Sequence, residues 1–255
     1  MKKLLSGIIL SCITVVNLNG TEPFLWIDDE DYKPYIYKDK DGNPKGVFKD
    51  LMDELFKRIN IPLKCELYPW KRSQKYVQDG KGDGMVTVPT ESRLKFTKPT
   101  DPLVYVHEKI FVRSDNPKID QIMKITKLEQ FKDYKVIEYI GAGWSEEHYK
   151  NLDMVWVPKQ SNAFIMLANK RGDIYVTSEF IGASSIKSLI KEKPQYKENL
   201  QKLIATPNSL TVLKFNLLIQ KNSKYIDIIP KLNKALKQMK KDGTYDKILN
   251  KYLTI

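Results

Sequence analysis

The chain has 255 residues, of which 42% are hydrophobic and 29% charged, a balance typical of a folded protein and not of a disordered one. No segment after residue 20 is long and uncharged enough to cross a bilayer. The formal net charge is +12, but the lysines are spread along predicted helices rather than gathered into one aromatic-studded stripe. We therefore expect solvated basic faces that favour anionic ligands, and no nucleic-acid partner.

The first twenty residues have the layout of a secretory signal peptide. Lys2 and Lys3 precede an apolar stretch at residues 4–16, and a short polar segment follows. A buried N-terminal strand or helix would not account for the two lysines. We expect residues 1–20 to be a signal peptide and the mature protein to be periplasmic or otherwise extracytoplasmic. A lipid anchor at Cys12 is the alternative.

Cleavage of that leader leaves Cys65 as the single cysteine, which cannot form an internal disulfide. Its alternating surroundings, Leu63–Leu67, predict a buried strand residue rather than a nucleophile. His107 and His148 have no cysteine or carboxylate partners at metal-ligand spacing, so no zinc site is predicted. Serine hydrolase, P-loop and dinucleotide signatures are absent, and we expect neither a cofactor nor catalysis.

The first ninety residues alternate short apolar runs with amphipathic segments. Strands are predicted at 24–27, 61–67 and 85–88. A helix is predicted at 47–58, where apolar residues recur with helical period, and another begins at residue 73. This alternation is typical of a parallel α/β sheet.

The second half of the chain repeats the alternation and ends in a separate tail. Its predicted elements are strands at 105–112, 135–140, 154–157 and 174–177, a helix at 163–169, a β-prone run at 209–219 and a lysine-rich C-terminal helix interrupted at Asp242-Gly243. The sequence therefore predicts two α/β halves and a C-terminal tail.

A set of short motifs occurs in a fixed order along residues 24–255. The motifs are Pro34-Tyr35, Gly46-Val47-Phe48-Lys49-Asp50-Leu51, Pro69-Trp70, Gly80-Lys81-Gly82-Asp83, Thr90-Glu91-Ser92-Arg93, Phe96-Thr97-Lys98-Pro99, Arg171-Gly172-Asp173, Leu232-Asn233-Lys234-Ala235-Leu236 and Lys241-Asp242-Gly243-Thr244. Each is weak alone, but the ordered set resembles the bacterial extracellular solute-binding proteins of family 3, the amino-acid-binding type of periplasmic receptor.

The resemblance implies an α/β fold of the two-lobed, periplasmic binding protein-like (type II) kind. Residues 21–110 and 213–255 would form the first lobe, and residues 111–212 the second. Two crossover hinge strands, at 109–112 and 212–219, would join them. The ligand would sit between the lobes, which close on it by hinge motion.

The resemblance also implies a function. The protein would capture a small polar or carboxylate-bearing ligand, an amino acid or organic acid, and deliver it as a monomer to the membrane permease of an ABC transporter. Two alternatives stay open: a dehydratase-like periplasmic enzyme on the same scaffold, with Glu179 as general acid, and a ligand-sensing module. Fold resemblance alone does not decide between them.

The match to the family assigns Arg93 to the ligand carboxylate. A guanidinium suits this role because it is always charged and offers two parallel donors to two oxygens. Without the resemblance, Arg93 reads as a surface arginine paired with Glu91. Thr90 could add a hydroxyl and a backbone N–H to the same carboxylate.

Aromatic residues would form the walls of the cleft. Trp70 stands where the family places an aromatic that stacks on the ligand, and Tyr32 is in the loop that supplies the other wall. Such residues are more often core, but the polar surroundings of Trp70 argue against a core position. Arg72 and Trp144 are further candidates for the cleft.

The chain departs from the family where a ligand's ammonium would be held. The family aspartate that carries this role falls near Ser178, with Glu179 adjacent. A serine cannot neutralise an ammonium, and an unpaired buried cation is costly. We therefore expect a small anion, or a carboxylate with a flat or apolar body, in preference to a zwitterionic or dibasic amino acid.

Overall fold

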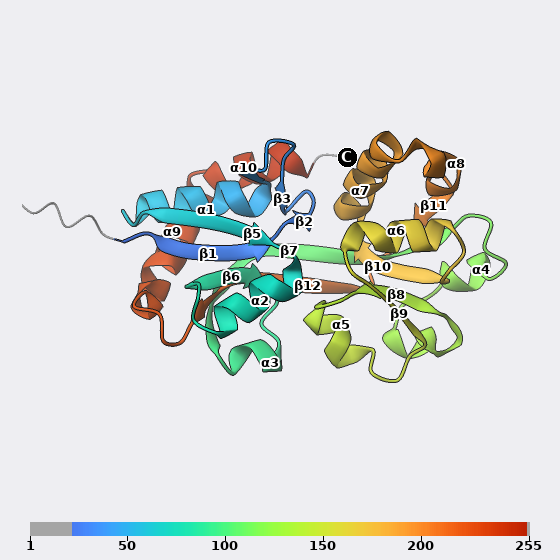
Figure 1. Cartoon of the computed structure of the whole chain (residues 1–255), viewed down its shortest axis with the longest axis horizontal. Coiled ribbons are helices and arrows are strands. Elements are labelled where there is room, and N and C mark those ends of the chain that lie inside the picture. The colour runs from blue at the N-terminus through green and yellow to red at the C-terminus, as the bar shows by residue number, and fades with distance from the viewer. Residues whose placement is uncertain (1–21, 254–255) are drawn as a thin grey trace, which may run out of the picture.

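Two long antiparallel strands, β7 (Thr97–Arg113) and β12 (Thr211–Gln220), run between the two halves of the molecule (Figure 1). Their pairing extends from the Thr97↔Gln220 pair to the Glu108↔Thr211 pair, with irregularities around Asn216. The computed structural model describes residues 22–253. The predicted leader at residues 1–20, including Cys12, lies outside the described residues.

The first half has the strand order β5-β1-β6-β12-β7. β1 runs parallel to both β5 and β6, whereas β12 runs antiparallel to β6. The elements of this half, including a small separate sheet of β2, β3 and β4, are β1 (Phe24–Asp29), β2 (Asp31–Tyr32), β3 (Ile36–Lys38), β4 (Pro44–Lys45), α1 (Val47–Arg58), β5 (Leu63–Tyr68), α2 (Trp70–Gln78), β6 (Gly84–Thr87) and α3 (Glu91–Leu94).

The second half continues the same sheet in the order β7-β10-β8-β9, with β11 pairing along β7. β8 lies parallel to β9 and β10, whereas β10 is antiparallel to β7. Its elements are α4 (Ile119–Ile122), η1 (Leu128–Asp133), β8 (Val136–Tyr139), α5 (Gly143–His148), β9 (Met154–Val157), α6 (Gln160–Ala168), β10 (Ile174–Ser178), α7 (Glu179–Glu192), η2 (Pro194–Tyr196), α8 (Lys197–Leu200) and β11 (Leu203–Ala205).

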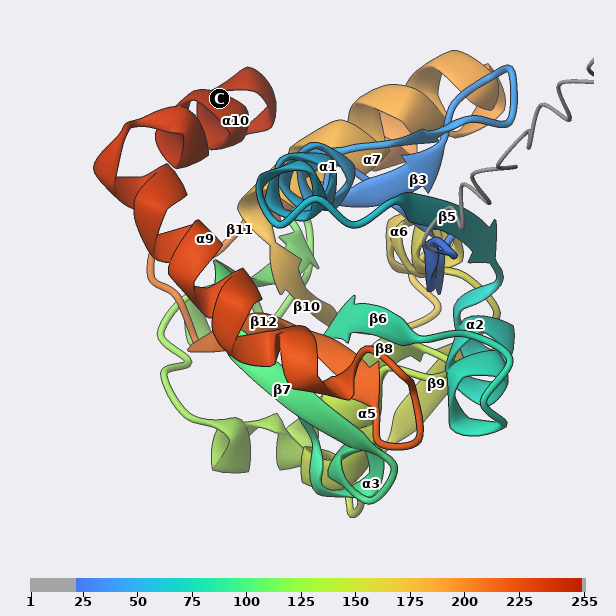
Figure 2. The ribbon, with the colours of Figure 1, turned by 90° about the vertical axis from the view of Figure 1, so that its left-hand side faces the viewer.

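The C-terminal segment returns to the first half. After β12 come η3 (Ile226–Ile228), α9 (Ile229–Lys241) and α10 (Thr244–Tyr252). Figure 2 shows α9 and α10 beside α1, on the half that contains β1, β5 and β6. The Tyr245 hydroxyl donates to the Leu103 carbonyl at 2.8 Å, and the Arg58 guanidinium pairs with Asp242 at 2.7 Å. The tail thus packs against the first half.

The elements begin and end close to where the sequence patterns place them. α1 and β9 have the expected bounds, because their apolar residues repeat at regular helical and strand spacing. β7 is much longer than the predicted strand at 105–112. Pro99 and Pro102 cannot donate to a sheet ladder, so the sequence pattern does not predict the first half of this strand. Helix α7 was not predicted, since Gly182 and several serines interrupt its apolar pattern.

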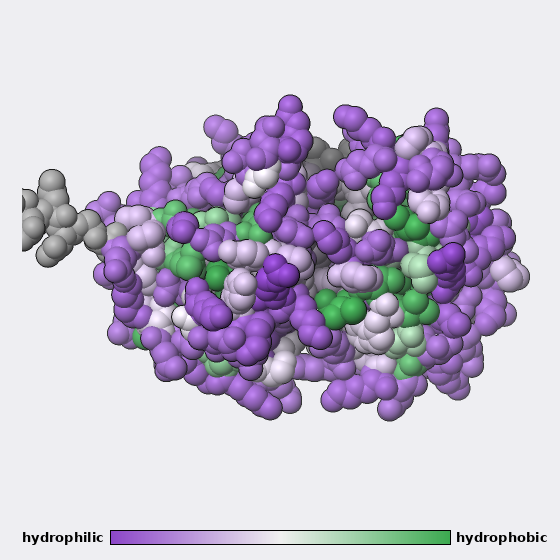
Figure 3. Space-filling view, in the orientation of Figure 1, coloured by the Kyte–Doolittle hydropathy of each residue, from purple (hydrophilic) through white to green (hydrophobic). Residues whose placement is uncertain are grey.

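The surface and the core follow from this arrangement. The face shown in Figure 3 is mainly hydrophilic, with apolar residues in small separate groups. Within residues 22–253, no helix combines the length and the apolar content that crossing a membrane requires. Cys65 lies in β5, partly buried as expected of a strand residue, and burial raises the pKa of its thiol.

Candidate functional site

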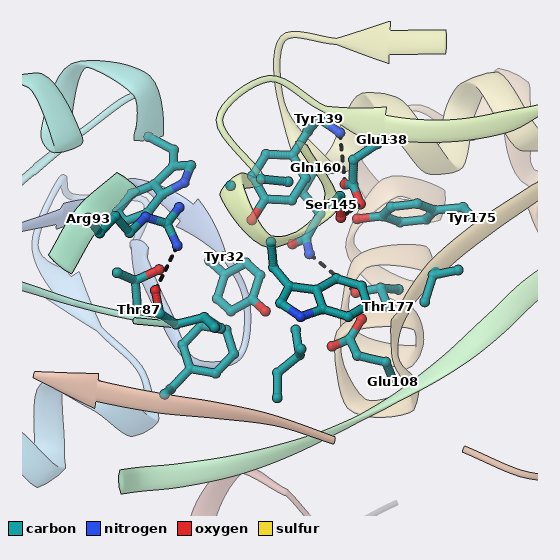
Figure 4. Close-up of a pocket in the computed structure, with 18 residues that line it drawn as sticks. Tyr32, Thr87, Arg93, Glu108, Glu138, Tyr139, Ser145, Gln160, Tyr175 and Thr177 are labelled. Atoms are coloured by element: carbon teal, nitrogen blue, oxygen red, sulfur yellow. Dashed lines mark hydrogen bonds between the residues drawn. The ribbon is translucent and has the colours of Figure 1, made fainter. Parts of the chain in front are cut away.

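A small cavity lies between the two halves, beside the crossing strands β7 and β12 (Figure 4). Side chains from β2, α2, β6 and α3 of the first half line it, together with side chains from β8, α5, α6 and β10 of the second. Its volume is about 50 Å³, which holds a few water molecules. A larger solute therefore requires the halves to open further. In the described part of the chain, no group of three or more His, Cys, Asp or Glu side chains could hold a metal ion.

Arg93 marks one end of the cavity. Its side chain is only 4% exposed, although it stands on the short helix α3. The guanidinium donates to Gln74 Oε1 at 3.0 Å, to the Val88 carbonyl at 2.9 Å and to the Gly141 carbonyl at 3.2 Å. Burial lowers its pKa to about 10, so the group stays charged at neutral pH. Three of its five N–H donors are used here, which leaves two for a solute.

The Gly141 carbonyl connects the two halves at this end. It belongs to the second half and accepts hydrogen bonds from three side chains of the first. Besides Arg93, the donors are the Trp70 indole N–H at 2.6 Å and the Gln74 amide at 3.0 Å. The Arg93 guanidinium also lies 5.4 Å from the centre of the Trp70 ring, within cation–π range. These contacts hold the halves together beside the cavity.

Two buried carboxyl groups mark the other end. Glu108 on β7 is 6% exposed, and Glu138 on β8 is 3% exposed. Burial is the main cause that raises the pKa of each to about 8, and the Glu138 carboxyl contributes to the rise at Glu108. Glu138 accepts from the Ser145 hydroxyl at 2.6 Å and from the Tyr139 backbone N–H at 2.9 Å. Sequence reasoning missed both residues.

Two more polar side chains lie at the end of the cavity that Glu108 and Glu138 line. Gln160, at the start of α6, and Tyr175, on β10, are both buried and line the cavity. The Gln160 amide donates only a long bond of 3.5 Å, to the Thr177 hydroxyl. In Figure 4, these groups lie with Glu108 and Glu138 on one side, Arg93 lies on the opposite side, and Tyr32 stands between.

Aromatic side chains form part of the wall. The Tyr32 ring stacks on Phe215 of β12, with ring centres 5.7 Å apart. Trp144, on α5, stacks on His148 at 4.2 Å. Both Tyr32 and Trp144 line the cavity, as does Trp70. Trp70 is also the first residue of α2 and is buried, so the expectation that its polar surroundings keep it out of the interior is wrong.

Four of the eight residues predicted for the site line the cavity: Arg93, Trp70, Tyr32 and Trp144. The reading of Arg93 as a surface arginine is wrong, because the side chain is buried and makes no salt bridge with Glu91 among the described residues.

The other four predicted residues lie outside the lining. Thr90 is buried and its hydroxyl contacts that of Ser92 at 3.0 Å, and Arg72 is exposed on α2. The Ser178 hydroxyl lies 3.4 Å from the Tyr35 hydroxyl. Glu179 is 41% exposed and pairs with Lys109 at 2.5 Å. The structure thus brings neither Ser178 nor Glu179 to the cavity.

The missed carboxyl groups overturn the premise of the ligand prediction. We expected a cleft with no assured acidic group, but Glu108 and Glu138 line it. A signal for both exists in the sequence. Glu138 interrupts the apolar strand Val136–Tyr139, and Glu108 alternates in phase with the apolar Val106, Ile110 and Val112. A glutamate that a strand buries is rare without a partner and points to a site.

Residues 26–255 match the model of the bacterial extracellular solute-binding proteins, family 3. The chain belongs to this family. The family match spans both halves of the sheet and the C-terminal helices, so every group described above lies within the solute-binding unit.

Known proteins of this kind are similar along most of the chain. The probable amino-acid-binding protein YxeM of Bacillus subtilis (strain 168) is 26% identical over 228 residues, covering 86% of this chain and 79% of that protein. A histidine kinase sensor domain with similarity to periplasmic binding proteins has a TM-score of 0.76 at 21% identity, covering 92% and 97% of the two chains. This likeness shows the fold alone.

A third relative, an ancestral amino-acid-binding protein that is a precursor of cyclohexadienyl dehydratase, has a TM-score of 0.69 at 26% identity, covering 92% and 96% of the chains. The predicted fold class and family are therefore confirmed: this is a periplasmic binding protein-like α/β fold of the solute-binding family 3.

Proposed function

We propose that the protein is an extracytoplasmic receptor that captures a small polar solute between its halves and delivers it to the permease of an ABC transporter. The observation that carries the proposal is the cavity itself. It lies between two halves joined by β7 and β12, and it holds a charged arginine with two N–H donors still available. An amino acid or organic acid would place its carboxylate on Arg93.

We assign residues 21–110 and 213–255 to one lobe and residues 111–212 to the other. In this assignment β7 and β12 are the hinge, and the contacts to the Gly141 carbonyl form when the lobes close. Closure around a solute explains why a binding residue, Arg93, also bonds across the gap. The energy of those bonds favours the closed state that the solute stabilises.

The proposal includes no catalysis. Glu179, the general acid of the alternative enzyme, is paired with Lys109 outside the cavity lining, which supports solute binding over that alternative. A sensor would have the same cavity as a transport receptor, but a different partner would bind its closed form. Uptake of the labelled solute by cells with and without this chain separates the two, because only a transport receptor is needed for uptake.

The first experiment is a screen of the purified chain for thermal stabilisation by amino acids, organic acids and amines. A solute at a hundred times its dissociation constant should stabilise by about 2.7 kcal/mol. Small-angle scattering with the best solute should then show a smaller radius of gyration, as lobe closure requires. A folded protein that no small polar solute stabilises would contradict the proposal.

A further inference from the structure

We infer that the outer side of helix α9 is a docking surface for an anionic membrane. Five lysines form this surface, which is called the α9 lysine face below: Lys231, Lys234, Lys237, Lys240 and Lys241. Its partner would be the negatively charged headgroups of phospholipids such as phosphatidylglycerol. The inference goes beyond solute capture, because no residue of α9 lines the cavity between the halves.

Helix α9 turns all of its lysines towards solvent. Its buried residues recur at helical spacing and pack against the first half: Leu232, Ala235, Leu236 and Met239. The five lysines occupy the remaining positions and are all exposed. Figure 2 shows α9 on the outside of the molecule, with no other element over its outer side. Core packing therefore fixes the helix with its charges pointing outwards.

The charge of this helix is not balanced by acids. Helix α9 contains neither aspartate nor glutamate. Among the salt bridges of residues 22–253, none involves a lysine of the α9 lysine face. Residues 221–253 contain nine lysines and three aspartates, a net charge of +6. Half of the formal charge of +12 therefore lies in this one segment.

The composition of the face favours a membrane over a protein partner. Protein interfaces have aromatic anchors and few lysines at their centre, and α9 contains no aromatic residue. The exposed large apolar side chains of the described chain lie on other elements: Leu94, Tyr105, Trp156 and Val212. Lysine is a point charge that imposes no bidentate geometry, which suits the diffuse charge of a fluid bilayer. Each lysine near an anionic bilayer increases affinity about fivefold.

Docking of this kind would be electrostatic and reversible. The apolar residues of α9 are already buried in the first half, so the helix has no apolar side to insert between lipids. The attraction then acts within a Debye length, about 8 Å at physiological salt. A docked receptor would stay near the permease that we propose as its partner. Its solute binding would be unchanged, since α9 contributes nothing to the cavity lining.

Vesicle flotation tests the docking. The purified chain would be mixed with vesicles of phosphatidylcholine and phosphatidylglycerol in equal parts. Vesicles of phosphatidylcholine alone control for insertion of the apolar stretch at residues 4–16. We expect at least tenfold tighter binding to the anionic vesicles at low salt, and loss of this difference at high salt. Equal binding to the two kinds of vesicle at low salt would overturn the inference.

Matched removal of charge assigns the binding to the α9 lysine face. One variant combines Lys231→Gln, Lys234→Gln, Lys237→Gln and Lys241→Gln. Lys240 is kept, because its ammonium lies 5.0 Å from the centre of the Tyr245 ring. The control variant removes four exposed lysines of the second half that form no salt bridge in the described chain: Lys124→Gln, Lys132→Gln, Lys150→Gln and Lys187→Gln.

The two variants should behave differently. We expect the α9 variant to bind anionic vesicles about fiftyfold more weakly than the wild type, and the control about fivefold more weakly at most. Thermal melts verify that both variants fold. Equal losses in the two variants would show attraction by net charge alone and overturn the assignment to α9. Tighter binding of the wild type to soluble poly-glutamate than to the vesicles would identify an acidic protein as the partner and overturn the membrane assignment.

The docking surface and the receptor function fail in different ways. The α9 variant should bind the best solute of the thermal screen as tightly as the wild type does. If the chain binds a solute but not the anionic vesicles, the receptor function stands and only the docking inference is wrong. If it binds the vesicles through α9 but no solute, the docking surface stands and the receptor function is wrong.

Discussion

Glu108 and Ser178 lie directly opposite each other on the antiparallel strands β7 and β10. Side chains paired in this way have Cβ atoms about 4.5–5.5 Å apart. The resemblance to family 3 predicts an acidic residue near position 178, where this chain has a serine. The acid is present after all, on the neighbouring strand. The Ser178 hydroxyl instead faces the Tyr35 hydroxyl at 3.4 Å, across the two halves.

The buried carboxyls predict how stability depends on pH. Burial raises the pKa of Asp28 to about 7 and that of Asp29, Glu108 and Glu138 to about 8. In the unfolded chain these groups ionise near pH 4, so above that pH the unfolded state binds fewer protons than the native state. The free energy of unfolding should therefore fall as pH rises from about 5 to about 8.

Urea unfolding of the ligand-free protein at several pH values measures this slope. Glu108→Gln cannot ionise, so it should be more stable than the wild type at pH 8 and close to it at pH 5. A wild-type stability that stays constant between pH 5 and pH 8 would show that these carboxyls are ionised in the native state.

Gly141 should be needed for closure. Its φ of +94° lies in the left-handed region, and a Cβ at this position would come within about 3 Å of Gln74 and Trp70. Gly141→Ala should therefore weaken solute binding at least fivefold. The control is Gly42→Ala, whose φ of +84° carries a similar backbone cost while its Cβ would meet nothing within 4 Å. Calorimetry on both variants separates the contact from the backbone strain, and equal affinities would exclude a role of Gly141 in closure.

A salt bridge on the rim should slow release of the solute. Lys159 of the second half pairs with Glu30 of the first at 2.9 Å. Exposed pairs contribute about 0–1 kcal/mol, so Lys159→Ala should raise the dissociation rate by at most about fivefold. High salt should reduce the difference. Lys202→Ala, which removes a pair inside the second half, is the control for stopped-flow measurements. A rate unchanged at low salt would contradict the prediction.

Arg93→Lys tests the carboxylate end. A lysine keeps the positive charge, but its single nitrogen cannot reproduce bonds to Gln74, Val88 and Gly141 while also holding two oxygens. Loss of a charge-assisted bond costs about 1.5–3 kcal/mol, which is roughly tenfold to a hundredfold in affinity. Arg171→Lys, an exposed arginine, serves as the control. If the Arg93 variant melts like the wild type and binds a carboxylate solute equally well, Arg93 has no role in binding.

The sequence predicts the elements of this fold far better than it predicts the composition of the cavity. Helix α1 follows from local periodicity, and Arg93 follows from an ordered motif. Glu108 and Glu138 are 30 residues apart in the sequence and line one cavity only because the sheet places β7 and β8 on either side of β10. Thr90 belongs to the same short motif as Arg93, and Arg72 lies two residues after Trp70, yet the side chains of Thr90 and Arg72 lie outside the lining of the cavity. Strand order and side-chain direction are long-range properties, which local patterns do not contain.

The position of Glu108 has a consequence for the order of events in binding. Glu108 belongs to β7 and is paired with both β12 and β10, so it stays beside the connecting strands whatever the angle between the halves. Trp70, Gln74 and Arg93 reach the Gly141 carbonyl only when the halves meet. A solute would thus contact Glu108 already in the open protein, and closure would follow as a separate, slower step. Binding should then be biphasic in time, with a fast phase that depends on concentration and a slow phase that does not.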